Sequence, residues 1–215
     1  MLKLFNTKSR KIEEFTPISN DIVTFYSCGP TVYNYYHIGN LRNAIFNDTL
    51  RRSLELHGYT VKHAINITDI GHLSSDADEG HDKLEESAKE KGKSVLEIAE
   101  HYTEAYKTDM REINNLEPNA YTSSIYQDHY ARATEFIDQQ ISMIKRILDN
   151  GYAYITKQAI YFDIAKLKEY NELNPQATQD KQVAVRSDIV VDSDKKSPYD
   201  FAIWFFATGR FENQQ

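Results

Sequence analysis

The sequence predicts an α/β protein built on a parallel sheet, and three segments support that prediction. Residues 22–27 (I-V-T-F-Y-S) are β-branched and aromatic, which is typical of a buried strand. Residues 41–57 place apolar side chains at helical spacing, between Asn40 as an expected N-cap and Gly58 as an expected stop. Residues 60–67 (T-V-K-H-A-I-N-I) predict a second strand. A strand, a helix and a strand of these lengths form a right-handed βαβ unit with parallel strands.

The remainder of the chain predicts further helices and strands in a mixed order. Ser94 to Glu97 form a capping box that opens a helix reaching about Asn114. The other expected elements are a helix over about 128–150, a hairpin of 152–156 with 159–163, a polar surface insertion over 164–200 and a returning apolar strand over 201–206.

Composition narrows the class of protein. The chain has 215 residues, a formal net charge of −7 and one cysteine, so an internal disulfide framework is excluded. No apolar run approaches the roughly 20 residues of a membrane span, and no signal peptide is recognisable, so we expect a cytoplasmic protein without a membrane partner. The acidic balance argues against a free-standing nucleic-acid binder, although it leaves room for a local basic face.

The segment from Tyr26 to Asn40 is the strongest candidate for a ligand site. A strand, a bent loop and a helix N-terminus follow one another here, and such an arrangement binds phosphate. His37 can donate to a phosphate oxygen, and Gly39 lets a flat ring approach the backbone. The alternative is an ordinary turn histidine beside a plain helix cap, but the βαβ context favours the phosphate site.

Cys28 and the end of the second strand have two interpretations each. Cys28 ends the first strand and precedes a Gly-Pro pair, so it suits either a nucleophilic thiolate or a metal ligand, and the residues alone leave both open. Thr68 and Asp69 either line the same crevice or form a simple strand-end turn.

Two other groups favour structural interpretations. Trp204, the only tryptophan, is expected to pack in a core. A cluster of histidines and carboxylates is more typical of a solvated acidic loop than of a metal site. The cluster comprises His72, Asp76, Asp78, Glu79, His81 and Asp82.

At this point the residues match a known family. Residues 28–40 (C-G-P-T-V-Y-N-Y-Y-H-I-G-N) closely resemble the signature of the cysteinyl-tRNA synthetases, which are class I aminoacyl-tRNA synthetases. Shorter matches follow in the family's order along the whole chain. They are L-F-N-T at 4–7, the helix with Arg51 and Arg52 before Gly58-Tyr59, N-I-T-D at 66–69 and D-F-A-I-W at 200–204.

The resemblance implies a role for each candidate residue. His37, Gly39 and Asn40 would bind ATP and stabilise the adenylation transition state, with Gly29, Pro30 and Thr31 also lining the ATP site. Cys28 would be the first ligand of a catalytic zinc ion that holds the substrate cysteine. Thr68 and Trp204 would lie beside the bound amino acid. The resemblance thus favours the metal interpretation of Cys28 and replaces the core interpretation of Trp204.

The resemblance also implies a fold, an activity and partners. The fold would be a Rossmann-like class I catalytic domain, with its first half at 1–118, a connective insertion at 119–200 and the start of the returning second half at 201–215. The activity would be that of a cysteine–tRNA ligase, a monomer using ATP with Mg²⁺, L-cysteine, tRNA(Cys) and one zinc ion. The remaining zinc ligands and the K-M-S-K-S loop would lie outside this chain, which would be an N-terminal portion.

Two alternative functions remain. The first is a ligase that activates cysteine for a small amino-sugar acceptor. The second is a paralogue that binds a nucleotide without catalysis.

Overall fold

The chain divides into two compact units, which are described separately. The computed structural model describes residues 1–71, 73–75, 79–82, 90, 92–173 and 193–206. The first unit comprises Met1–His72 and Lys83–Glu135, and the second comprises Leu73–Asp82 and Phe136–Gln215. The divisions expected from the sequence at residues 118 and 200 stay a prediction.

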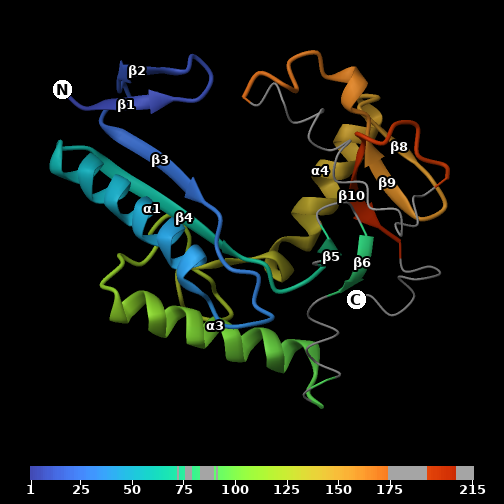
Figure 1. The fold of residues 1–215 in the computed structure, drawn as a ribbon, viewed down its shortest axis with the longest axis horizontal. Helices are drawn as coiled ribbons and strands as arrows, with labels where there is room; N and C mark the ends of the chain where they lie inside the picture. Colours follow the sequence, from blue (N-terminus) through green and yellow to red (C-terminus); the bar gives the residue numbers. More distant parts are fainter. Residues whose placement is uncertain (72, 76–78, 83–89, 91, 174–192, 207–215) are drawn as a thin grey trace. The chain divides into compact units, whose positions relative to one another are not determined.

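The first unit contains a parallel three-stranded sheet in the order β3-β4-β7, with a separate β1–β2 hairpin (Figure 1). β3 and β4 are parallel in the register Ile22↔Thr60 to Ser27↔Ile65, which confirms the predicted βαβ unit. The elements of this unit are β1 (Lys3–Asn6), β2 (Lys11–Glu14), β3 (Ile22–Ser27), α1 (Ile38–Leu56), β4 (Thr60–Ile67), α3 (Val95–Glu112), β7 (Ala131–Arg132) and η1 (Ala133–Phe136).

The helix α1 begins three residues earlier than the sequence indicates. Its N-cap is His37, whose side chain accepts a hydrogen bond from the Gly39 backbone N–H. Asn40 is the third residue of the helix, and its side chain accepts from the His37 backbone N–H. The prediction of Asn40 as the N-cap was therefore wrong, because Asn40 takes the reciprocal position of a capping box whose cap is a histidine.

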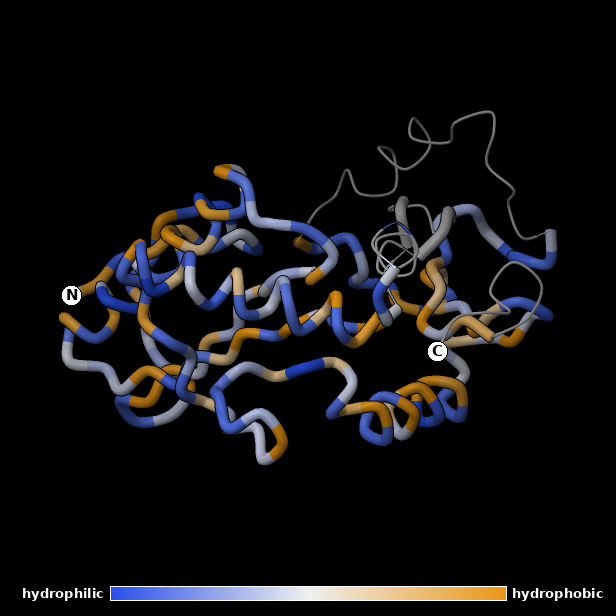
Figure 2. Tube along the Cα trace, turned by 90° about the horizontal axis from the view of Figure 1, so that it is seen from below, coloured by the Kyte–Doolittle hydropathy of each residue, from blue (hydrophilic) through white to orange (hydrophobic). Residues whose placement is uncertain are grey.

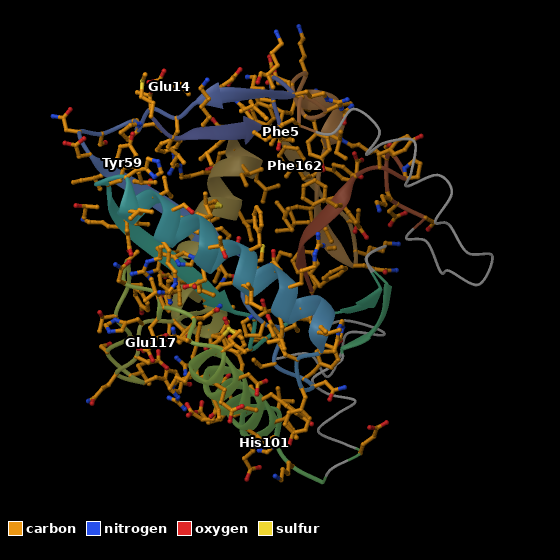
Figure 3. All side chains as sticks on the ribbon, turned by 60° about the vertical axis from the view of Figure 1, so that its left-hand side comes forward. Phe5, Glu14, Tyr59, His101, Glu117 and Phe162 are labelled. Carbon is orange, nitrogen blue, oxygen red and sulfur yellow. The ribbon has the colours of Figure 1, made fainter. Side chains whose placement is uncertain are left out.

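Two apolar clusters hold the first unit together. One lies between α3, the loop after β3 and the end of β4, and it comprises Val32, Ile67, Ile98, Ala99, Tyr102, Tyr106, Met110 and Tyr130. The other packs α1 against the start of the sheet through Val23, Leu54 and Val61. Figure 3 labels His101 on α3 and Tyr59, the residue that precedes β4. The predicted capping box of α3 is confirmed, since Ser94 and Glu97 bond reciprocally.

Residues 128–132 are not helical, contrary to the sequence expectation of a helix from about residue 128, and only the 3₁₀ helix η1 directly precedes α4. Ala131 and Arg132 instead form β7, which pairs in parallel with Asn66 and Ile67. The guanidinium of Arg132 is 2% exposed and bonds both oxygens of Asp128 at 2.9 and 3.0 Å. Burying this ion pair and adding a strand to the sheet outweigh local helix propensity.

The second unit is built on an antiparallel sheet in the order β10-β9-β8. The predicted hairpin and helix end are confirmed, and the apolar positions of α4 recur at helical spacing, as the hydropathy trace shows (Figure 2). The expected apolar strand after residue 200 is present as β10, and it pairs with β9. The elements are β5 (Leu73–Ser75), β6 (Glu79–Asp82), α4 (Ile137–Asp149), β8 (Ala153–Ile155), β9 (Ala159–Phe162), η2 (Ile164–Lys166) and β10 (Phe201–Phe205).

Asp200 fixes the start of β10. Its carboxylate is 1% exposed, accepts from the Tyr154 hydroxyl at 2.7 Å and accepts from the Ile164 backbone N–H at 3.1 Å. A buried carboxylate with two donors ties β8, η2 and β10 together. Among the described residues, no helix has both the length and the apolar character needed to cross a lipid bilayer.

Candidate functional site

The site begins where β3 and β4 end side by side. Because the two strands are parallel, their carboxyl ends lie at one edge of the sheet, where ligands bind in α/β proteins. The pairing continues beyond the strands, since Thr31 and Thr68 form a parallel bridge. The Thr68 N–H donates to the Pro30 carbonyl at 2.9 Å, and the Val32 N–H donates to the Thr68 carbonyl at 3.3 Å. The structure thus brings together the predicted residues Pro30, Thr31 and Thr68.

Gly29 is required by the close approach of β4. A Cβ atom at this position would lie 1.8 Å from the Asn66 carbonyl oxygen and 2.8 Å from Cγ2 of Ile65. Backbone atoms cannot yield as a flexible side chain can, so any larger residue would push the loop after β3 away from β4. The glycine that follows Cys28 therefore holds the two chain segments in contact.

The side chain of Asn66 connects three parts of this edge. Its Oδ1 accepts from the Gly29 N–H at 2.9 Å and from the Tyr26 hydroxyl at 2.9 Å. Its Nδ2 donates to the Thr68 hydroxyl oxygen at 3.0 Å. The sequence interpretation missed Asn66, although the N-I-T-D match included it, because the parallel register alone reveals its partners.

Cys28 is an exposed free thiol between two tyrosines. Burial raises the pKa of Tyr26 and of Tyr36, and the neighbouring Cys28 sulfur raises each further. A single accessible thiol at a strand end suits one ligand of a metal ion. Within the part of the chain that the structure describes, however, no three His, Cys, Asp or Glu side chains gather closely enough to hold a metal. One thiolate does not make a zinc site by itself, so these residues do not fit a complete one.

At the N-terminus of α1, a hydrogen bond fixes the tautomer of a neutral His37. Nδ1 of His37 accepts from the Gly39 N–H at 3.1 Å, so a neutral ring carries its proton on Nε2. A Cβ atom on Gly39 would lie 2.8 Å from Cε1 of the same ring, so glycine leaves space for the imidazole to lie over the first turn. The side chain is exposed. The arrangement can offer an outward N–H donor at the positive end of a 19-residue helix.

Asp69 links the end of β4 to the segment that follows β7. Its carboxylate accepts from the backbone N–H of Thr134 at 3.1 Å and from the Thr134 hydroxyl at 2.5 Å. Asp69 is 5% exposed and anchors η1, and it also lines a cavity of about 280 Å³ together with Thr103 and Arg132. The sequence did not indicate the anchoring of η1, and the place of Asp69 in a ligand crevice stays a prediction.

A buried imidazole lies behind the site. His63 is 2% exposed, and its Nε2 lies 2.8 Å from the Ser27 hydroxyl. Its ring stacks on Phe25 at a centroid distance of 4.4 Å, and burial lowers its pKa to about 4, with Arg51 adding to the effect. Among the described residues, Nδ1 has no hydrogen-bond partner. His63 and Cys28 both line a cavity of about 20 Å³, which has room for one water molecule.

The remaining candidates belong to the second unit or lie outside the described residues. Trp204 is half-buried on β10, where the pairing with β9 is irregular between Ala202 and Trp204, and so it belongs to the second unit. His72, Asp76 and Asp78 of the acidic loop lie outside the described residues. Glu79, His81 and Asp82 belong to β6, a strand that replaces part of the expected loop.

Comparison with known proteins identifies the family. A family model for the catalytic domain of class I (C) tRNA synthetases matches residues 14–212. The chain belongs to this family. The class I tRNA synthetase assignment agrees with the parallel β3-β4-β7 sheet, and the α/β fold class predicted from the sequence is confirmed.

Curated class I relatives are similar over almost the whole chain. The chain is 45% identical to the cysteine–tRNA ligase of Treponema denticola over 213 residues, covering 99% of this chain and 41% of that protein. It is 42% identical to cysteine–tRNA ligase 1 of Burkholderia lata, covering 99% of this chain and 43% of that protein. It is also 42% identical to the Zymomonas mobilis cysteine–tRNA ligase over 200 residues, covering 93% and 36%. The chain therefore spans about two fifths of the length of these relatives.

Proposed function

We propose that these residues form part of the cysteine-activating site of a cysteine–tRNA ligase. The observation that carries the proposal is the N-terminus of α1, where His37 caps the helix through Nδ1 and presents Nε2–H outward. A donor at the positive end of a long helix suits an anion such as the phosphates of ATP. The similar proteins are cysteine–tRNA ligases, which supports cysteine as the amino acid and tRNA as the acceptor.

In the proposed reaction, the carboxylate of L-cysteine attacks the α-phosphate of ATP, bound with Mg²⁺. Pyrophosphate leaves, and cysteinyl-adenylate forms. His37, Gly39 and Asn40 would stabilise the charge that develops on the phosphate, since donors fixed before the reaction cost no reorganisation in the transition state. Gly29, Pro30 and Thr31 would line the nucleotide side of the site. The cysteinyl group would then pass to tRNA(Cys), with the protein acting as a monomer.

Cys28, Thr68 and Trp204 would face the amino acid. We propose that Cys28 contributes one thiolate ligand to a zinc ion whose other ligands lie outside the described residues. Zinc bound there would select cysteine over serine, because it prefers a thiolate to a hydroxyl. Thr68 follows β4 at the same edge as Cys28, which supports its place beside the amino acid.

The test is cysteine-dependent exchange of pyrophosphate into ATP by the full-length protein that contains these residues. The informative variant is His37→Asn, because asparagine is a good N-cap and should preserve α1 while removing the outward imidazole donor. We expect a loss of about 100-fold in kcat, the size measured when one preorganised donor is removed.

The matched control is His57→Asn at the other end of the same helix. His57 is the exposed C-cap residue of α1, and its ring nitrogen lies 2.8 Å from the Ser53 carbonyl. We expect this variant to keep its exchange rate. Exchange that does not depend on cysteine, or that survives His37→Asn, would contradict the proposed function. Transfer of cysteine to an amino sugar instead of tRNA would favour the alternative ligase.

A further inference from the structure

The orientation of the Asn66 amide follows from its partners. A backbone N–H can only donate, so the atom that faces Gly29 at 2.9 Å must be the amide oxygen. The amide nitrogen then faces Thr68, and it can only donate, so the Thr68 hydroxyl oxygen accepts at 3.0 Å. The Gly29 N–H thus decides between the two orientations of the Asn66 amide.

This orientation leaves the hydroxyl hydrogen of Thr68 available. A hydroxyl has one hydrogen to donate, and the Asn66 amide uses only a lone pair of the oxygen. Within the described ranges, no acceptor takes that hydrogen. Thr68 lies half-buried at the carboxyl edge of the sheet, where its backbone pairs with Pro30 and Val32. Its hydroxyl is therefore held as a donor at the edge where ligands bind.

We propose that Asn66 is a positioning residue that keeps the Thr68 hydroxyl a donor toward a carboxylate oxygen of the bound amino acid. The same amide holds the Gly29 peptide, and through it the Cys28 backbone, at a fixed distance from Thr68. The Asn66 side chain thus fixes the loop that contains Cys28 and also makes the Thr68 hydroxyl a donor toward the ligand. The inference rests on the proposed function for the identity of the ligand.

The decisive variant is Asn66→Asp, which keeps the size of the side chain and reverses one hydrogen bond. One carboxylate oxygen still accepts from Gly29, while the other now accepts the hydroxyl hydrogen of Thr68. The hydroxyl then presents only lone pairs to the ligand. In pyrophosphate exchange by the full-length protein, we expect the KM for cysteine to rise at least about tenfold, as for a lost hydrogen bond to a charged group. Competitive inhibition by cysteamine, which lacks the carboxylate, should weaken less than about threefold.

Testing Asn66→Asp in a Thr68→Val background distinguishes the loss of the hydroxyl donor from the effect of the added negative charge. Thr68→Val removes the hydroxyl at nearly constant size, so Asn66→Asp should add less than about twofold to the KM in that background. Equal effects of Asn66→Asp in both backgrounds would mean that the new carboxylate simply repels the substrate, and this would overturn the proposal. Equal weakening of cysteine and cysteamine would overturn it as well, because it would indicate a general collapse of the site.

A further measurement does not depend on the proposed function. The Gly29 N–H donates to the Asn66 side chain, so in hydrogen exchange of the full-length protein the peptide that contains Gly29 should exchange faster in Asn66→Ala than in wild type. Asn150→Ala at the end of α4 makes the same substitution elsewhere and should leave the exchange at Gly29 unchanged.

The pyrophosphate-exchange test and the measurement in the preceding paragraph can give negative results independently of each other. If the wild-type protein shows no cysteine-dependent exchange, the proposed function and the carboxylate ligand both fall. Faster hydrogen exchange at Gly29 in Asn66→Ala would then still support Asn66 as the residue that holds the loop containing Cys28. If pyrophosphate exchange is present but Asn66→Ala leaves the hydrogen exchange at Gly29 unchanged, the position assigned to Asn66 is wrong.

Discussion

The buried imidazole of His63 makes the stability of the first unit depend on pH. Burial holds the pKa of His63 at about 4 in the folded chain, against 6.5 for an exposed histidine. Arg51 lowers the pKa further, while Asp48 and Glu55 of α1 act in the opposite direction. Between these two pH values His63 is protonated in the unfolded chain but neutral in the folded chain. The stabilising contribution is therefore present above about pH 6.5 and is lost as pH falls toward 4.

The size of the effect follows from the lowering of the pKa by about 2.5 pH units, which corresponds to about 3 kcal/mol at most. Between about pH 7 and pH 5, linkage gives a loss of about 2 kcal/mol from this one group. A 2 kcal/mol change is a large part of the stability of a typical domain, so it should be readily measured.

Urea unfolding at about pH 7 and pH 5 provides the assay. Helical circular dichroism reports on α1 and α3 of the first unit together with α4 of the second unit, and the fluorescence of Trp204 identifies the transition of the second unit separately. Carboxylates also titrate, so wild type is compared with His63→Gln, which cannot ionise. The variant should lose about 2 kcal/mol less than wild type between the two pH values. His57→Gln gives the change caused by removing an exposed imidazole. Equal losses in wild type and His63→Gln would refute the argument that His63 is buried in its neutral form.

Three further predictions concern backbone contacts and caps. Gly29→Ala should destabilise the first unit by at least about 3 kcal/mol in urea unfolding, because its Cβ would meet the Asn66 carbonyl; a loss under about 1 kcal/mol would contradict that contact. Gly39→Ala should change the melting temperature little, since better helix propensity offsets the displaced His37 cap, yet it should weaken ATP binding in a titration; unchanged binding would show that the ring position is unimportant. Ser94→Ala should cost about 1 kcal/mol in urea unfolding through the lost cap of α3, and a neutral result would contradict the observed capping box.

The strands of the βαβ unit could be predicted from the sequence because their signals are local. Residues 22–27 and 60–67 are runs of β-branched and apolar residues, and β3 and β4 have the same bounds. The start of α1 was mispredicted because asparagine is a far commoner cap than histidine, so Asn40 masked His37. The two-residue strand β7 gives no periodic signal, and its pairing with β4 depends on contacts distant in the sequence.

In the candidate site, too, the sequence indicated only the residues that carry a local signal. The sequence indicated Cys28, His37 and Thr68, each from a local motif or a resemblance. It did not indicate Asn66, whose hydrogen bond to the Gly29 backbone spans 37 residues and exists only in the β3–β4 register. It also left Asp69 undecided, since its partner Thr134 lies 65 residues away. Side chains that organise a site through distant partners carry no pattern of their own.

The position of β3 in the sheet has a consequence for handling these 215 residues. In the order β3-β4-β7, the described residues give β3 a hydrogen-bonded neighbour on one side only, so its other side is an open row of backbone donors and acceptors. Ile22 and Tyr26 are 40% and 62% exposed along this strand. An apolar open edge recruits further strands, so concentrated preparations should self-associate through β3, immediately beside the Cys28 loop.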